Sequence, residues 1–148
     1  SLNALMGCSG AGKTSLLRSI NGLYNRYLSD ETKIYLSKYQ YIRTCFVVQE
    51  ASDHLLSGIT AGEAMTYASR LKNPAINFDH KKNVEDLMKE LMIFNTFDVL
   101  VDRCSGGEQK RLVIAMELTA ECKPNLLCID EPTSGLDSFA AEIVSEIS

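Results

Sequence analysis

The segment Gly7–Thr14 has the residue types and the spacing of a phosphate-binding loop. It reads glycine, four residues, glycine, lysine and then a hydroxyl residue. Such glycines let backbone N–H groups curl around an anion, the lysine adds a full positive charge, and the threonine hydroxyl can bind Mg²⁺. The residues that we expect to contact a nucleotide are Gly7, Ser9, Gly10, Gly12, Lys13, Thr14 and Ser15.

Two adjacent carboxylates, Asp130 and Glu131, follow the apolar run Leu126–Ile129. This run predicts a central parallel strand, and such sheets bind ligands at the carboxyl ends of their strands. In phosphoryl transfer, the first acid can hold Mg²⁺ through water and the second can orient and polarise the attacking water. An acidic pair is weak evidence by itself, but the phosphate-binding loop in the same chain strengthens it.

Gln49 ends a β-favouring run that begins at Cys45. A single glutamine at a strand end is by default a solvated side chain. Because Gln49 lies between the loop and the acidic strand, we also expect it as a ligand of Mg²⁺ or water.

Ser105–Glu108 reads Ser-Gly-Gly-Glu and opens a predicted helix. Ser105, Gly106, Gly107 and Glu108 could offer free N–H groups to an anion. The plainer interpretation is a helix N-cap with an acid in its first turn. Since the chain already has one phosphate loop, we expect this segment to serve a nucleotide that another subunit holds.

The surrounding pattern predicts an α/β architecture with a helical insertion. Short apolar runs predict strands at Leu2–Met6, Cys45–Gln49 and Leu126–Ile129, and apolar residues at helical spacing follow the loop from Leu16 to Leu23. Residues 24–44 suggest loops and short edge strands.

Four further helical segments are expected, and their apolar residues are interpreted as core. The first follows the capping-box spacing of Thr60 and Glu63, and the third begins near Ser105. The residues expected to face inward are Ala61, Ala64, Met65 and Ala68, then Val84, Leu87, Met88, Leu91 and Met92, then Leu112, Ala115, Met116 and Thr119, and finally Ala140, Ile143, Val144 and Ile147.

Composition restricts the function classes. The chain has 148 residues, with 15 Lys and Arg against 19 Asp and Glu and a formal net charge of −4, which argues against a nucleic-acid footprint. Its apolar runs are far shorter than the roughly 20 residues that span a bilayer. The five cysteines lack the paired spacings of a metal site, so we expect reduced thiols, and we expect His54 and His80 to be solvated.

The ordered motifs of the loop, Gln49, Ser105–Glu108 and Leu126–Pro132 resemble an ATP-binding-cassette (ABC) ATPase domain. The run Glu131–Ser138, Glu-Pro-Thr-Ser-Gly-Leu-Asp-Ser, together with Ser-Gly-Gly-Glu-Gln-Lys-Arg-Leu before it, resembles most the G subfamily, the white-type half-transporters. Cys8 and Cys104 depart from the usual small or aliphatic residues, and residues 25–43 match no pattern that we can name.

The resemblance implies a P-loop NTPase fold with a central, mostly parallel sheet and a helical subdomain. It implies ATP and Mg²⁺ as cofactors, with Thr14, Gln49 and Asp130 at the metal and with Glu131 and Gln49 as catalytic residues. Two such domains, identical or different, would close head to tail around two ATP molecules. Each ATP would lie between one phosphate loop and the opposite Ser105–Glu108 segment, and Asp137 would couple the two sites.

The resemblance also implies a membrane part in the same polypeptide, which places the domain at the cytosolic face of a membrane. Residues 1–148 would be a partial ATP-binding domain, without the adenine-stacking aromatic residue and the switch histidine of the family. We therefore expect this segment alone to bind Mg-ATP weakly and to hydrolyse it negligibly. Gln49 and the helices Thr60–Leu71 and Val84–Met92 would lie nearest the membrane part.

Three functions remain open at this point. The first is the ATPase of a transporter, with lipids, sterols and pigment precursors as candidate substrates and no nucleic acid as partner. The second is a soluble ABC ATPase of the translation or DNA-repair class. The third, a binding-only pseudo-ATPase, is disfavoured because Lys13, Asp130 and Glu131 are present.

Overall fold

The computed structural model describes residues 4–23, 28–35, 41–47 and 54–130. In chain order its elements are α1 (Lys13–Ile20), β1 (Thr44–Val47), α2 (Ala61–Lys72), α3 (His80–Glu90), the 3-10 turns η3 (Phe94–Thr96) and η4 (Val101–Arg103), α4 (Gly106–Leu118) and β2 (Leu126–Ile129). Gln49, Glu131, Asp137 and the predicted last helix lie outside the described residues.

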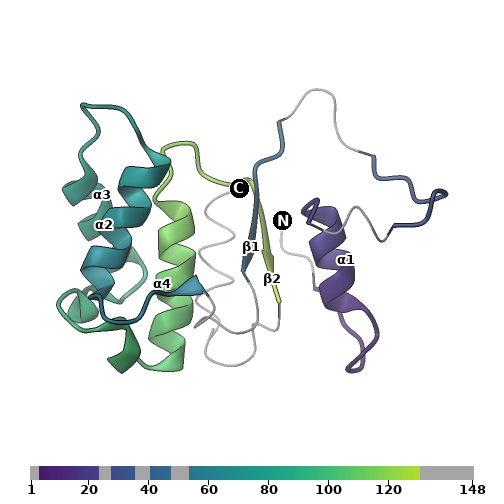
Figure 1. Cartoon of the computed structure of the whole chain (residues 1–148), viewed down its shortest axis with the longest axis horizontal. Coiled ribbons are helices and arrows are strands. Elements are labelled where there is room, and N and C mark those ends of the chain that lie inside the picture. The colour runs from purple at the N-terminus through teal and green to yellow at the C-terminus, as the bar shows by residue number, and fades with distance from the viewer. Residues whose placement is uncertain (1–3, 24–27, 36–40, 48–53, 131–148) are drawn as a thin grey trace.

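β1 and β2 form a parallel pair in which Thr44 lies opposite Leu126 and Val47 lies opposite Ile129. In Figure 1, α1 lies on one side of this pair, and α4, α2 and α3 lie on the other side. The strands run toward the same edge at which α1 and α4 begin (Figure 1). This arrangement confirms the predicted α/β class.

The strand predicted at Leu2–Met6 is wrong for the residues that are described. Ala4, Leu5 and Met6 have no regular secondary structure, and Met6 is 90% exposed. A strand forms where its backbone groups pair with a neighbour, and in the described part of the sheet β1 and β2 pair with each other. Residues 28–35 and 41–43 likewise contain no strand.

The core lies between α2, α3, α4 and β1, as the apolar spacing predicts. Met65, Met88 and Leu112 are 0–1% exposed in it. The predicted capping box at Thr60 and Glu63 is present at the start of α2. In the described part of the chain we find no helix with the length and apolar character that a membrane crossing needs.

Two residues differ from the prediction in their exposure to solvent. Met92 is 68% exposed, because α3 ends with Leu91 as C-cap and the backbone of Met92 turns into the left-handed region, at a φ of 53°. His80 is half-buried rather than solvated, since its Nδ1 lies 3.0 Å from Ser69 Oγ. His54 is exposed, as expected.

The start of α2 packs tightly on the segment that leads from α3 to Ser105. The N–H groups of Ala61 and Gly62 donate to the carbonyls of Val99 and Phe97, both at 2.9 Å. This close approach leaves no space for a side chain at Gly62, where a Cβ would lie 2.8 Å from the Phe97 ring.

We therefore expect Gly62→Ala to lower the free energy of unfolding by about 1–3 kcal/mol, the usual cost of overpacking. Gly106→Ala is the matched control, because a Cβ at Gly106 would meet nothing within 4 Å. Urea unfolding of both variants measures the difference. Equal stability of Gly62→Ala and the unsubstituted chain would contradict this packing.

Candidate functional site

The loop before α1 has the backbone shape that its glycines predict. Gly10 and Gly12 have φ values of 78° and 88°, in the left-handed region. A Cβ at either position would meet nothing within 4 Å, so the dihedral angle rather than space requires glycine there. The N–H of Ala11 donates to the Cys8 carbonyl at 3.2 Å and closes the turn.

Lys13, the first residue of α1, lies across this loop. Its Nζ donates to the carbonyls of Gly7 and Cys8, at 2.9 and 3.0 Å. The two bonds hold the ammonium charge inside the curve of the loop. A phosphate entering the loop would therefore meet a positive charge that is already in place.

The N-terminus of α1 differs from those of the other α-helices that the structure describes. α2 and α4 begin with capping boxes that use Glu63 and Glu108, and Asp79 caps α3. α1 has Gly12 as its N-cap, without a side-chain cap, and has no acidic residue in its first turn. Its first N–H groups and partial positive charge thus suit an external anion.

Thr14 and Asp130 lie in contact although they are far apart in the sequence. Thr14 Oγ1 donates to Asp130 Oδ2 at 2.6 Å. A hydroxyl and a carboxylate oxygen are the kind of ligands that Mg²⁺ takes beside substrate phosphates and water. The residues present therefore fit a magnesium ion, and the two that would hold it lie beside the phosphate loop.

The strand pair places Asp130 at this point. Asp130 follows β2 directly, and its backbone N–H donates at 3.0 Å to the carbonyl of Val47, the last residue of β1. Asp130 is 6% exposed. The carboxyl ends of both strands therefore meet the first turn of α1.

Ser105–Glu108 forms a capping box in the structure. Ser105 Oγ accepts from the Glu108 N–H at 3.3 Å, and the Glu108 carboxylate accepts from the N–H and the hydroxyl of Ser105 at 2.8 and 2.7 Å. These bonds lower the pKa of Glu108. They agree with the N-cap interpretation, and they do not use the N–H groups of Gly106 and Gly107.

Sequence reasoning missed the structural part that Gln109 plays beside this segment. Its Nε2 donates to the carbonyls of Val101 and Cys104, at 3.0 and 3.3 Å, and so holds the turn before Ser105. The signal in the sequence is a polar residue, Gln109, directly after the acid of the predicted helix cap. The roles of Ser9, Ser15 and the other predicted ligands stay predictions.

The lowered pKa of Glu108 makes the stability of α4 pH-dependent. A carboxyl with a depressed folded-state pKa stabilises the fold above its ordinary pKa, and this contribution is lost as the pH falls through the lowered value. At pH 7 we expect Glu108→Gln to lower the free energy of unfolding by about 0.5 kcal/mol. The difference should shrink in acid. Urea unfolding measures this difference in the free energy of unfolding. The same difference at pH 7 and in acid would contradict the role of the Glu108 carboxylate.

Comparison with known proteins places these features in a family. The family model described as ABC transporter matches residues 1–134. ABC transporter G family member 22 of Arabidopsis thaliana is 38% identical over 149 residues, which cover 93% of this chain and 19% of the relative. The ABC transporter ATP-binding protein/permease wht-3 of Caenorhabditis elegans is 34% identical over 155 residues, 97% of this chain and 25% of the relative.

A solved structure shares the fold. The cbiO1 protein of Clostridium perfringens, part of the ABC transporter complex cbiONQ, superposes with a TM-score of 0.68 at 24% identity, over 96% of this chain and 58% of that chain. The chain spans between 12% and 25% of the length of the first curated relatives that it matches. On its motifs, its fold and the family match, the chain belongs to the ABC transporter family.

Proposed function

We propose that the chain binds Mg-ATP at the phosphate loop and is the ATP-hydrolysing part of a G-type ABC transporter. The observation that supports this most directly is the Thr14–Asp130 contact beside Lys13, because it puts two oxygen groups suited to Mg²⁺ next to a loop suited to phosphate. The family match, whose domains are ATPases, agrees with it.

Each described residue has a physical task in this proposal. The loop N–H groups and the start of α1 bind the phosphates, and Lys13 neutralises their charge. Thr14 and Asp130 would hold Mg²⁺. When bound, Mg²⁺ would supply positive charge that neutralises the charge developing during phosphoryl transfer.

Glu131 and Gln49 complete the proposed chemistry from positions outside the described residues. Glu131 follows Asp130 in the chain, so its carboxylate would orient and polarise the attacking water. Gln49 follows β1 by two residues and would reach the metal or that water. The chemistry of the residue types and their adjacency to Asp130 and β1 support both assignments.

Ser105, Gly106, Gly107 and Glu108 are proposed to contact the ATP of a second ABC ATPase domain, either a copy of this chain or a different one. In Figure 1, α4 begins at the same edge as α1, on the other side of the strands. The segment would thus face outward from the edge where the first ATP binds. Its two glycines leave room for a close backbone approach.

Residues 1–148 are proposed to be part of a longer polypeptide that includes a transmembrane part, at the cytosolic face of a membrane. The name of wht-3 as an ATP-binding protein/permease and the share of the relatives that the chain covers support this. A soluble ABC ATPase of the translation or DNA-repair class is the second candidate. The G-family name of one relative favours the transporter.

The test is ATP binding and hydrolysis by the natural protein that contains this chain. Lys13→Ala should weaken nucleotide binding by about tenfold or more, because it removes the charge inside the loop. Glu131→Gln should keep binding but lower the turnover number by about 10²- to 10⁴-fold, since it removes the proposed base. Equilibrium binding of a fluorescent ATP analogue and phosphate release measure the two effects.

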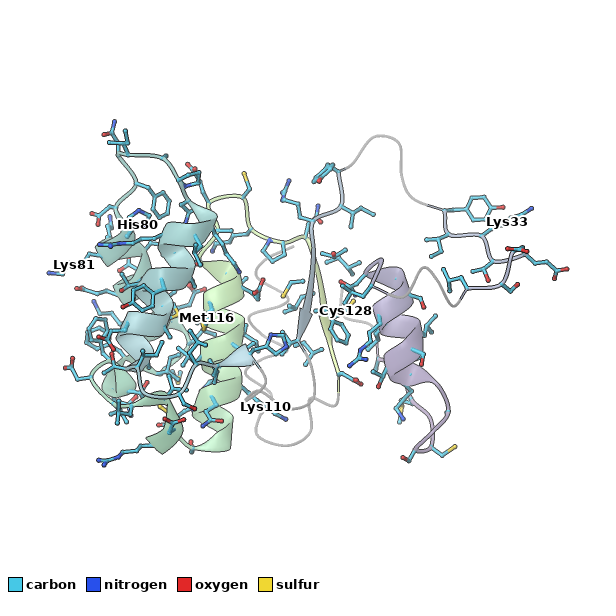
Figure 2. All side chains as sticks on the ribbon, viewed as in Figure 1. Lys33, His80, Lys81, Lys110, Met116 and Cys128 are labelled. Carbon is cyan, nitrogen blue, oxygen red and sulfur yellow. The ribbon has the colours of Figure 1, made fainter. Side chains whose placement is uncertain are left out.

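Lys33→Ala is the matched control for Lys13→Ala, because Lys33 is exposed and lies beyond α1 in Figure 2, away from the strand ends. Turnover that survives Glu131→Gln would refute the base assignment. Nucleotide binding that survives Lys13→Ala would refute the phosphate site.

A further inference from the structure

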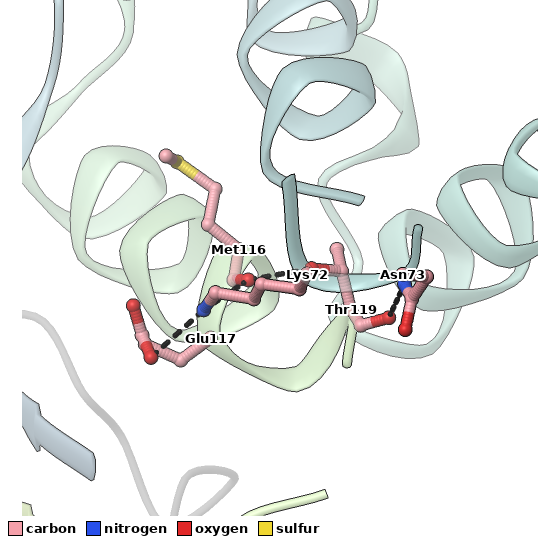
Figure 3. A network of polar contacts seen from close by, with 5 residues as sticks. All are labelled: Lys72, Asn73, Met116, Glu117 and Thr119. Carbon is pink, nitrogen blue, oxygen red and sulfur yellow. Dashed lines mark hydrogen bonds and ion pairs between the residues drawn. The ribbon is translucent and has the colours of Figure 1, made fainter. Parts of the chain in front are cut away.

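An ion pair joins the C-terminal ends of α2 and α4. Lys72 Nζ lies 2.8 Å from Glu117 Oε2, and it also donates to the Met116 carbonyl at 2.9 Å (Figure 3). The same ammonium therefore pairs with a carboxylate and caps a carbonyl in the last turn of α4. A cation at this end of a helix is favoured by the helix dipole.

The next residue, Asn73, strengthens this junction. It is 4% exposed, and its Nδ2 donates to the Thr119 carbonyl at 2.8 Å and to the Ser69 carbonyl at 2.9 Å. Its Oδ1 accepts from the N–H of Glu121 at 2.7 Å. The last residue of α2, Lys72, and its C-cap, Asn73, thus bind the chain where α4 ends (Figure 3).

Glu117 also contacts the strand pair. Glu117 and the buried Cys45 of β1 line the same pocket, and burial, with the nearby Glu117 charge, raises the pKa of Cys45 to about 12. The thiol therefore stays protonated at neutral pH and adds no second negative charge beside Glu117. Glu117 lies between the cation of α2 and the first half of β1.

The other end of β1 holds the metal site. Val47, two residues after Cys45, accepts the N–H of Asp130 at 3.0 Å, and Asp130 accepts the Thr14 hydroxyl at 2.6 Å. A short, continuous run of contacts therefore leads from Lys72 through Glu117 and β1 to the residues that would bind Mg²⁺.

An exposed ion pair contributes little to stability by itself. Lys72 and Glu117 have side chains that are 29% and 39% exposed, so Coulomb attraction alone is a weak reason for the pair. The hydrogen bonds of Lys72 and Asn73 to the end of α4 indicate that the pair positions these helices. Without Lys72, the Glu117 charge would remain beside β1 without its cation, and the Met116 carbonyl would keep the Thr119 hydroxyl but lose the Lys72 ammonium as a donor.

We propose that the Lys72–Glu117 pair is a positioning contact for ATP turnover, which holds the α2–α4 unit against β1. It would fix the distance between the Ser105–Glu108 segment, at the other end of α4, and the strand ends that place Asp130. Lys72 and Glu117 touch no nucleotide in this proposal, which rests on the proposed ATPase function.

The experiment compares Lys72→Met with Lys72→Arg, and uses the exposed Lys81→Met, which breaks an ordinary i,i+4 pair with Glu85, as the matched control. In the natural protein we expect Lys72→Met to lower kcat for ATP by about fivefold or more, with a nucleotide Kd within about twofold. Lys72→Arg should restore kcat because it keeps the charge. The double variant Lys72→Met/Glu117→Gln should have a kcat no lower than that of Lys72→Met alone, since the two residues act as one unit.

Hydrogen exchange gives a second readout that needs no activity. In Lys72→Met, amides of β1 and of residues 116–119 should exchange about fivefold faster or more, and in Lys81→Met they should not. Three results would each overturn the proposal. They are an unchanged kcat in Lys72→Met, a lower kcat with weaker nucleotide binding that Lys72→Arg does not rescue, and unchanged hydrogen exchange. Absence of Lys13-dependent hydrolysis in the unsubstituted protein would instead refute the proposed function, and exchange alone would then decide whether the contact exists.

Discussion

The parallel pairing of β1 with β2 is the constraint on which the candidate site depends. The last carbonyl of β1 binds the backbone of Asp130, and this places the Asp130 carboxylate against Thr14 in the first turn of α1. Without this register, the phosphate loop would lack the Asp130 carboxylate beside Thr14. The chain builds the site from parts more than one hundred residues apart because parallel strands place their carboxyl ends at one edge.

Two of the helices that begin at this end of the described structure, α1 and α4, differ in how their first turns are satisfied. α1 starts at Gly12 with neither a side-chain cap nor an acid, whereas Ser105 and Glu108 cap α4. The first arrangement suits a ligand that the chain holds itself. The second gives a stable, preformed segment, which suits contact with a nucleotide that a second domain presents, as the proposed function requires.

The sequence predicted the elements whose signals are local. The glycine spacing before Lys13, the capping residues Thr60 and Ser105 and the helical apolar spacing all correspond to observed structure. Ala4, Leu5 and Met6, the described part of the predicted strand Leu2–Met6, form no strand, because pairing depends on a neighbour rather than on apolar composition. The Lys72–Glu117 pair had no local signal, since tertiary packing alone brings these residues together.

The proposed function depends most on Thr14 and Asp130, which would form one magnesium site beside the phosphate loop. The most direct measurement is the Mg²⁺ dependence of nucleotide binding by the natural protein in a double-mutant cycle of Thr14→Val and Asp130→Asn. We expect each substitution to weaken Mg²⁺-dependent nucleotide binding by about tenfold or more, and the double variant to bind little more weakly than either single variant. Additive effects of the two substitutions would contradict a shared magnesium site. Nucleotide binding by the unsubstituted protein that does not depend on Mg²⁺ would contradict it as well.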